Sequence, residues 1–142
     1  MVNAKEKIKS SDLRIGNWIE RLGVFEKVYS LSQEWFRVES DSHKAYSYDN
    51  INGIVITPEI LEKAGFVPIG HFTVMGNMTY NLGRNRYLSI GCIGTPNETL
   101  YVCEKEDIVC VHNFDYDGKL YLHTLQNLVH ILTGTELPIK FD

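Results

Sequence analysis

The segment VITPEILEKAGF, residues 55–66, decides the fold, because it has the pattern of a short helix placed between two runs of strands. Thr57 is a good N-cap, since a threonine hydroxyl accepts a hydrogen bond from an unpaired N–H of the first turn. Pro58 suits the first helical position, where its missing N–H costs nothing. Glu59 places negative charge at the positive end of the helix dipole. These signals predict a helix over residues 58–64.

The end of this helix is marked as clearly as its start. Gly65 readily adopts the left-handed conformation that closes a helix, and Phe66 can fold back on Leu61 in a Schellman motif. Ile56, which precedes the cap, can pack on Leu61 as a hydrophobic staple. A helix of about two turns is not stable alone in water, so we expect it to pack against a core formed with the flanking strands.

The preceding residues, 12–56, have the alternation of apolar and polar side chains that is typical of short strands. The candidate strands are GNWIERL (16–22), VFEKVYSLS (24–32), WFRVES (35–40) and AYSYDNINGIVIT (45–57). Gly23 and a polar turn, DSHK at 41–44, separate neighbouring strands. Four or five such strands predict a small curled β-sheet or an SH3-like barrel, because closure hides the strand edges.

Strands return after the helix, over residues 70–112. The candidates are HFTVMG (71–76), MTYNLG (78–83), RYLSIGCIG (86–94), TLYVCE (99–104) and DIVCVHNF (107–114). Consecutive strands with such short connections are most simply antiparallel neighbours. Strands, a short helix, more strands and a C-terminal helix at about 123–133 predict an α+β fold rather than a parallel sheet.

The length of 142 residues is enough for one domain with a core of its own, so we expect a single domain over 1–142. A possible subdivision separates an SH3-like β unit, 12–56, from an α+β unit, 57–142. The lysines of the first eleven residues alternate with polar side chains, and we expect residues 1–11 to form a flexible tail.

Composition excludes several classes of protein. The net charge of -4 disfavours a general nucleic-acid binder, which needs a basic surface. No run approaches the roughly eighteen apolar residues of a membrane helix, and the start lacks a signal-peptide core. Cys92, Cys103 and Cys110 are odd in number and irregularly spaced, which favours reduced thiols over a disulfide framework or a zinc site. We therefore expect a cytoplasmic protein without membrane association.

The C-terminal helix carries a concentrated set of polar side chains, within LHTLQNLVHILTGTEL at 122–137. On a helical wheel, leucine and valine side chains share one face, and the opposite face holds His123, Gln126, Asn127 and His130. The histidines are seven residues apart, roughly 10.5 Å along the axis, which is too far for one metal ion. The stripe is either an exposed interaction surface or, if buried, a structural latch whose amides bond to neighbouring backbone.

A second candidate site is basic and aromatic. The stretch TYNLGRNRYL, residues 79–88, places Arg84 and Arg86 beside Tyr80 and Tyr87. Interleaved arginine and aromatic side chains can hold single-stranded nucleic acid, because bases stack on rings while arginine pairs with phosphate. Two arginines in an acidic half of the chain make nucleic acid the second hypothesis rather than the first.

An enzymatic site has little support from sequence motifs. GxSxG, P-loop and GxGxxG patterns are absent, so no catalytic residue, cofactor or metal is predicted. An enzyme would need a site assembled from dispersed side chains, for which Cys110, His112, His123 and His130 are the candidates. That hypothesis requires at least two of them to converge in a concave pocket.

Three motifs resemble those of a family of small uncharacterised proteins from gut-type bacteria and their phages. They are DLRIGNWI (12–19), ITPEILEKAGF (56–66) and LHTLQNLVHILTGTEL (122–137). The family's closing motif is similar to HxLQNLxxxLTGxEL, which this chain fits from His123 to Leu137. Its middle motif usually has leucine where this chain has Ile56. The resemblance covers about 12–137 and implies a shared fold, without an established activity or catalytic residues.

These observations together predict a small intracellular, non-enzymatic protein that acts by binding another protein. A nucleic-acid-associated module of phage or mobile-element origin is the first alternative. An enzyme with a site of dispersed histidine and cysteine side chains is the second.

Overall fold

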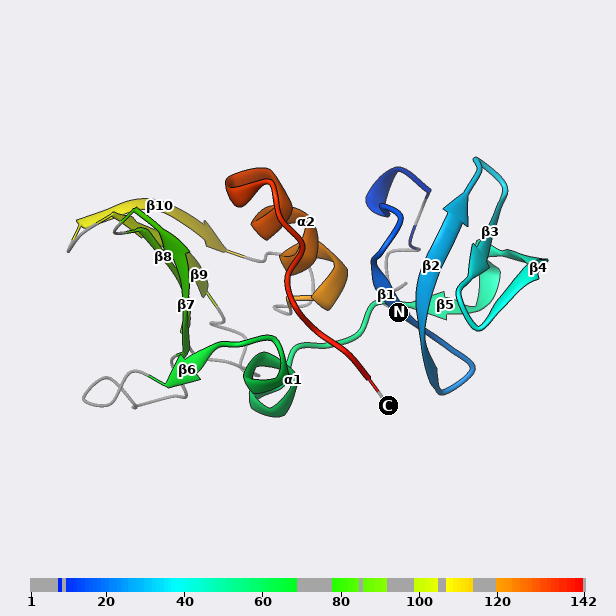
Figure 1. The fold of residues 1–142 in the computed structure, drawn as a ribbon, viewed down its shortest axis with the longest axis horizontal. Helices are drawn as coiled ribbons and strands as arrows, with labels where there is room; N and C mark the ends of the chain where they lie inside the picture. Colours follow the sequence, from blue (N-terminus) through cyan, green and yellow to red (C-terminus); the bar gives the residue numbers. More distant parts are fainter. Residues whose placement is uncertain are drawn as a thin grey trace, which may run out of the picture. The chain divides into compact units, whose positions relative to one another are not determined.

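The fold of the computed structural model is α+β, as predicted (Figure 1). The structure describes residues 8, 10–68, 78–84, 86–91, 99–104, 107–113 and 120–141. Within these residues the strands form two five-stranded antiparallel sheets, accompanied by two α-helices. The chain divides into two compact units, one made of Met1–Ile54 with Tyr121–Asn127 and the other of Val55–Leu120 with Leu128–Asp142.

The sheet of the first unit has the strand order β4-β3-β2-β1-β5. Its strands are β1 (Trp18–Arg21), β2 (Val24–Leu31), β3 (Trp35–Val38), β4 (Asp41–Ser47) and β5 (Ile51–Asn52). The hydrogen-bonded order ends at β4 on one side and β5 on the other, so the sheet is open and not a closed barrel. One face holds a core that includes Ile19, Val28 and Phe36.

Two local predictions in this sheet were wrong. Residues 41–44, expected to be a turn, begin β4, and the chain reverses at Glu39 and Ser40 instead. An edge strand faces solvent on one side, so a polar segment such as this one can be extended there. Residues Tyr48–Asn50, expected to be extended, form a single 3-10 turn, whose N-cap Ser47 accepts a hydrogen bond from the N–H of Asp49.

In the second unit, helix α1 (Pro58–Lys63) confirms the predicted caps, and Ala64 is its C-cap. Thr57 Oγ1 accepts a hydrogen bond from Ile60 N at 3.2 Å. Gly65 has φ +96°, and the N–H of Phe66 donates to the Leu61 carbonyl at 2.9 Å, which is the Schellman closure.

The sheet of the second unit confirms the predicted antiparallel pairing of sequential strands. Its order is β10-β9-β8-β7-β6. The strands are β6 (Val67–Pro68), β7 (Met78–Gly83), β8 (Arg86–Gly91), β9 (Thr99–Glu104) and β10 (Asp107–Asn113). Leu88 and Ile90 on β8 are fully buried and pair with β9. The predicted strand 71–76 lies outside the described residues.

Helix α2 (Leu122–Thr133) matches the predicted C-terminal helix and starts one residue earlier. Gly134 follows with φ +74°, and its N–H donates to the His130 carbonyl at 2.8 Å. The segment Tyr121–Asn127 belongs to the first unit, whereas the chain from Leu128 belongs to the second. The predicted subdivision at residue 56 did not foresee this return of the chain to the first unit. Among the described residues, neither helix has the length and apolarity needed to span a bilayer.

Candidate functional site

Gln126 on α2 is the most buried polar side chain of the predicted stripe, with 1% of its surface exposed. Its Oε1 accepts a hydrogen bond from the backbone N–H of Trp18 at 2.8 Å, where β1 begins. Its Nε2 donates to the carbonyl of Gly16 at 3.1 Å. Both ends of the amide are therefore paired with backbone, which removes the cost of burying them.

The neighbouring Asn127 extends the same network to the loop before β1. Its Oδ1 accepts hydrogen bonds from Asn17 Nδ2 at 2.8 Å and from Arg14 Nε at 3.2 Å. Its Nδ2 donates to the Asp12 carbonyl at 3.2 Å. Asn17 is fully buried, and its Oδ1 accepts from the backbone N–H of Arg14 at 2.6 Å. We name Asn17, Gln126 and Asn127 the amide cluster.

The polar atoms of the two helix residues of the amide cluster are engaged within the protein. Every side-chain oxygen and nitrogen of Gln126 and Asn127 has a partner within the protein. Amides bonded in this way to neighbouring backbone and side chains hold the helix to the loop before β1.

His123 is the other buried member of the stripe, with its ring stacked on that of Tyr121 at a centroid distance of 6.0 Å. Burial lowers the pKa of His123, and the nearby charge of Asp12 opposes this only in part. The imidazole is therefore neutral at pH 7. Within the described part of the chain, its buried Nδ1 has no hydrogen-bond partner.

The close packing around His123 depends on a glycine. A Cβ atom at Gly53 would lie 2.5 Å from Cδ1 of Tyr121 and 3.0 Å from Cε1 of His123. His130, the fourth residue of the predicted stripe, is half-buried and belongs to the second unit. The helix therefore does not present the four polar residues as one exposed surface.

The four residues of the predicted nucleic-acid site are not gathered on one face. By the pairing of β7 with β8, Tyr80 lies opposite Leu88 and Tyr87 opposite Asn81, which places the two tyrosines on opposite faces. Tyr80 packs on Phe66, with ring centroids 5.1 Å apart.

The two arginines of that site also differ from each other. Arg86 donates from Nη2 to the Leu132 carbonyl at 3.4 Å, in the last turn of α2, where a cation suits the helix dipole. Arg84 is exposed at the tip of the β7–β8 turn, with φ +55°. Of the four predicted residues, only Arg84 is an exposed side chain.

The dispersed enzymatic site is described only in part. Cys110 and His112 lie on β10, and their side chains are outside the described residues. His123 and His130 lie seven positions apart on one helix, so they do not share one reaction centre. Over the residues that the structure describes, no three histidine, cysteine or acidic side chains are grouped to hold a metal ion.

The β1–β2 hairpin carries a feature that motif analysis missed. Leu22 at its tip is 73% exposed and has φ +52°, a left-handed conformation that is unfavourable for leucine. Five of the eight exposed large apolar side chains among the described residues belong to this hairpin and the loop before it: Ile15, Leu22, Val24, Phe25 and Tyr29. We name Leu22, Val24 and Phe25 the hairpin tip.

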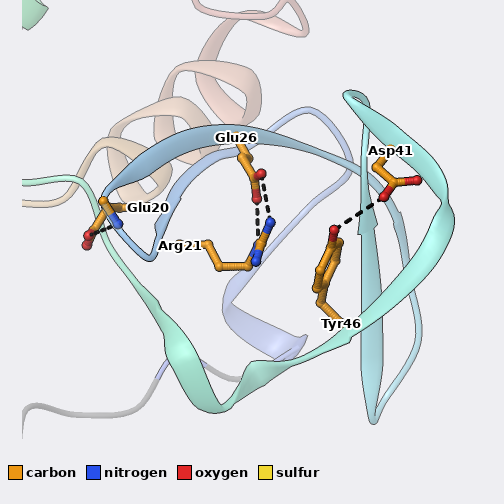
Figure 2. A network of polar contacts seen from close by, with 6 residues as sticks. Glu20, Arg21, Glu26, Asp41 and Tyr46 are labelled. Atoms are coloured by element: carbon orange, nitrogen blue, oxygen red, sulfur yellow. Dashed lines mark hydrogen bonds and ion pairs between the residues drawn. The ribbon is translucent and has the colours of Figure 1, made fainter.

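The strands on both sides of the hairpin tip are held by a charged network (Figure 2). Arg21 donates to both carboxylate oxygens of Glu26, at 2.8 and 3.0 Å, and this pairing raises the pKa of Arg21. The guanidinium carbon of Arg21 lies 3.9 Å from the ring centroid of Tyr46. The hydroxyl of Tyr46 donates to Asp41 at 3.4 Å. The network braces β1, β2 and β4 against one another.

The sequence carries one signal at the tip, which can be read only once the register of the hairpin is known. Arg21 pairs with Val24, so the turn contains only Leu22 and Gly23. Two-residue hairpin turns with both residues left-handed favour Asn-Gly, and leucine at the first position is unusual. An apolar residue at a position that favours asparagine or glycine marks the tip as a candidate functional site.

Comparisons of this chain with family models, with curated proteins and with solved structures found no match.

Proposed function

We propose that this protein is a non-enzymatic module that binds another protein through the hairpin tip. The observation that carries this proposal is Leu22, which is strained and exposed at the same position. Asparagine would relieve the strain and would expose less apolar surface to water, so folding alone does not favour leucine there. A binding role accounts for both properties.

The apolar surface around Leu22 supports the same proposal. Val24 and Phe25 follow directly in β2 and are 55% and 40% exposed. Val24 pairs with Arg21 and Phe25 with Glu20, so these two apolar side chains lie on opposite faces of the hairpin. The tip therefore has the form of an apolar knob, which suits a concave apolar surface on the partner.

The cations near the tip are paired within the protein, which disfavours an acidic partner surface. Arg21 is paired with Glu26, and Lys27 Nζ lies 3.6 Å from Glu39 Oε2. Because these charges are compensated within the protein, they offer little to a charged ligand. Apolar docking of this kind responds weakly to salt, whereas binding to nucleic acid weakens steeply as salt rises.

The amide cluster has a supporting role in this proposal. It is a structural latch that fastens the first half of α2 to residues 12–18, next to the start of β1. A fixed β1 gives the hairpin a fixed base, which lowers the entropy cost of binding at its tip. We place the protein in the cytoplasm and among the small bacterial and phage proteins that its three motifs resemble.

The nucleic-acid alternative has weaker support from the geometry. Arg84 is exposed, but Arg86 is engaged with the end of α2 and the two tyrosines lie on opposite faces. A stacking platform needs aromatic and basic groups on a common surface.

Site-specific crosslinking tests the proposal. A photoreactive amino acid in place of Phe25 is expected to crosslink one partner protein. The control carries the same amino acid in place of Ile131, an exposed residue on α2, and should not give this crosslink. The crosslink should persist between about 50 and 500 mM salt and should resist nuclease treatment.

Competition makes the test specific for the tip. Excess wild-type protein should suppress the crosslink, whereas the Leu22→Asn variant should not. Equal suppression by both proteins, or loss of the crosslink at high salt, would count against docking by the hairpin tip.

A further inference from the structure

The carboxylate of Glu20 contacts the hairpin turn from β1 (Figure 2). Its Oε1 accepts a hydrogen bond from the backbone N–H of Gly23 at 3.1 Å. Its Oε2 accepts from Nδ2 of Asn52 on β5 at 3.1 Å. One side chain therefore connects the turn to the neighbouring strand.

This contact falls on the peptide between Leu22 and Gly23, which sets ψ of Leu22 and φ of Gly23. Leu22 and Gly23 have φ +52° and +83°, the signs of a type I′ turn. The N–H of Gly23 belongs to the peptide that joins these two residues. Rotation of that peptide would turn the N–H away from Glu20 and would change ψ of Leu22 and φ of Gly23, so the turn would no longer be type I′.

We propose that Glu20 is a positioning residue that holds Leu22 in its exposed, left-handed conformation, with Asn52 holding Glu20 in turn. This inference rests on the proposed binding function of the hairpin tip. Glu20 is assigned a positioning role because each of its oxygens accepts a hydrogen bond from within the unit, one of them from the turn itself.

The location of these bonds separates positioning from a general structural role. Both bonds are exposed to solvent, and exposed bonds contribute little to the free energy of unfolding. Loss of Glu20 is therefore expected to change the turn without unfolding the unit. Replacement of a core residue such as Ile19, which is fully buried beside Glu20 on β1, would instead unfold the unit.

Nuclear magnetic resonance on the full chain tests this without a partner. In Glu20→Ala, exchange of the Gly23 amide with water should become roughly tenfold faster, as expected for the loss of one hydrogen bond. The coupling constants between the amide and α protons of Gly23 should shift as φ of Gly23 is averaged. The melting temperature should change little.

Glu20→Gln is the conservative variant, since glutamine keeps an oxygen for the N–H of Gly23. It should restore both the slow exchange and the wild-type amide–α couplings of Gly23. In Asn52→Ala, the slow exchange and the wild-type couplings of Gly23 should be partly lost. Glu39→Ala removes another exposed carboxylate of the same unit, which pairs with Lys27, and should leave the β1–β2 turn unchanged.

Unchanged exchange and unchanged amide–α couplings at Gly23 in Glu20→Ala would overturn the positioning role. That result would leave docking by the hairpin tip intact, because crosslinking from position 25 tests the docking separately. A turn that changes in Glu20→Ala while crosslinking never depends on Leu22 would instead support the positioning and refute the docking.

Discussion

Gln126 and Trp18 are joined by a hydrogen bond of 2.8 Å across 108 positions of the chain. The bond connects α2 to the first residue of β1, and Gln126 completes it by donating to the Gly16 carbonyl. A side chain near the end of the sequence therefore satisfies backbone at its beginning. The first unit needs residues 121–127 for this reason.

Replacement of Gln126 by alanine should destabilise the protein by about 2–4 kcal/mol, because it leaves a backbone N–H and a carbonyl unpaired in a buried place. Thr124→Ala, an exposed site on the same helix, should have an effect below about 0.5 kcal/mol. Urea unfolding measures both. Equal midpoints for the two variants would show that the amide of Gln126 contributes nothing.

The Asn127→Asp and Asn127→Ala variants should differ in their free energy of unfolding. Asn127→Asp keeps an oxygen for Asn17 and Arg14 and adds charge next to the guanidinium, but it loses the bond to the Asp12 carbonyl. We expect a loss of about 1–2 kcal/mol for alanine and a smaller one for aspartate. Unfolding curves at equal ionic strength would reveal the order, and an aspartate variant less stable than alanine would contradict these contacts.

His123 should make stability depend on pH. Burial lowers the pKa of the folded imidazole, so below the usual value of about 6.5 the unfolded chain binds a proton that the folded chain does not. The stability that the neutral, buried imidazole contributes is present above about pH 6.5 and is lost as the pH falls toward the pKa of the folded state.

The measurement is the free energy of unfolding at about pH 7.5 and at about pH 5.5. The wild-type protein should lose more stability between these values than His123→Gln does. His43→Gln, at an exposed position on β4, should follow the wild type. An unchanged pH dependence in His123→Gln would mean that another group controls acid sensitivity.

Leu22→Asn should stabilise the protein, in contrast to most substitutions. Asparagine with Gly23 is the preferred pair for a two-residue turn with both φ angles positive, so relief of strain should add about 1 kcal/mol. Thermal unfolding would show this as a higher midpoint. A lower midpoint would mean that the Leu22 side chain is packed in solution rather than exposed.

The parts of the fold that depend on nearby residues were predictable from the sequence. The caps of α1 agree with the structure because Thr57 and Gly65 act within one turn of the helix. Residues 41–44 were mistaken for a turn, because their polarity fits an edge strand as well as a loop.

The site depends on more distant contacts, which a helical wheel cannot show. The wheel separated Gln126 and Asn127 from the leucine face but could not tell which chain segment would cover them. Their partners lie 108 to 115 positions away in the sequence. Leu22 escaped attention because sequence patterns reveal apolar side chains but not the backbone angle that makes one of them strained.

The central claim is that the hairpin tip binds a protein partner, and competition for the crosslink from position 25 tests it most directly. Unlabelled wild-type protein and Val67→Asn, altered at an exposed apolar site of the second unit, should compete equally. Leu22→Asn should compete at least about tenfold less well, although it is folded and more stable. Competition by Leu22→Asn equal to that of the wild type would contradict the claim.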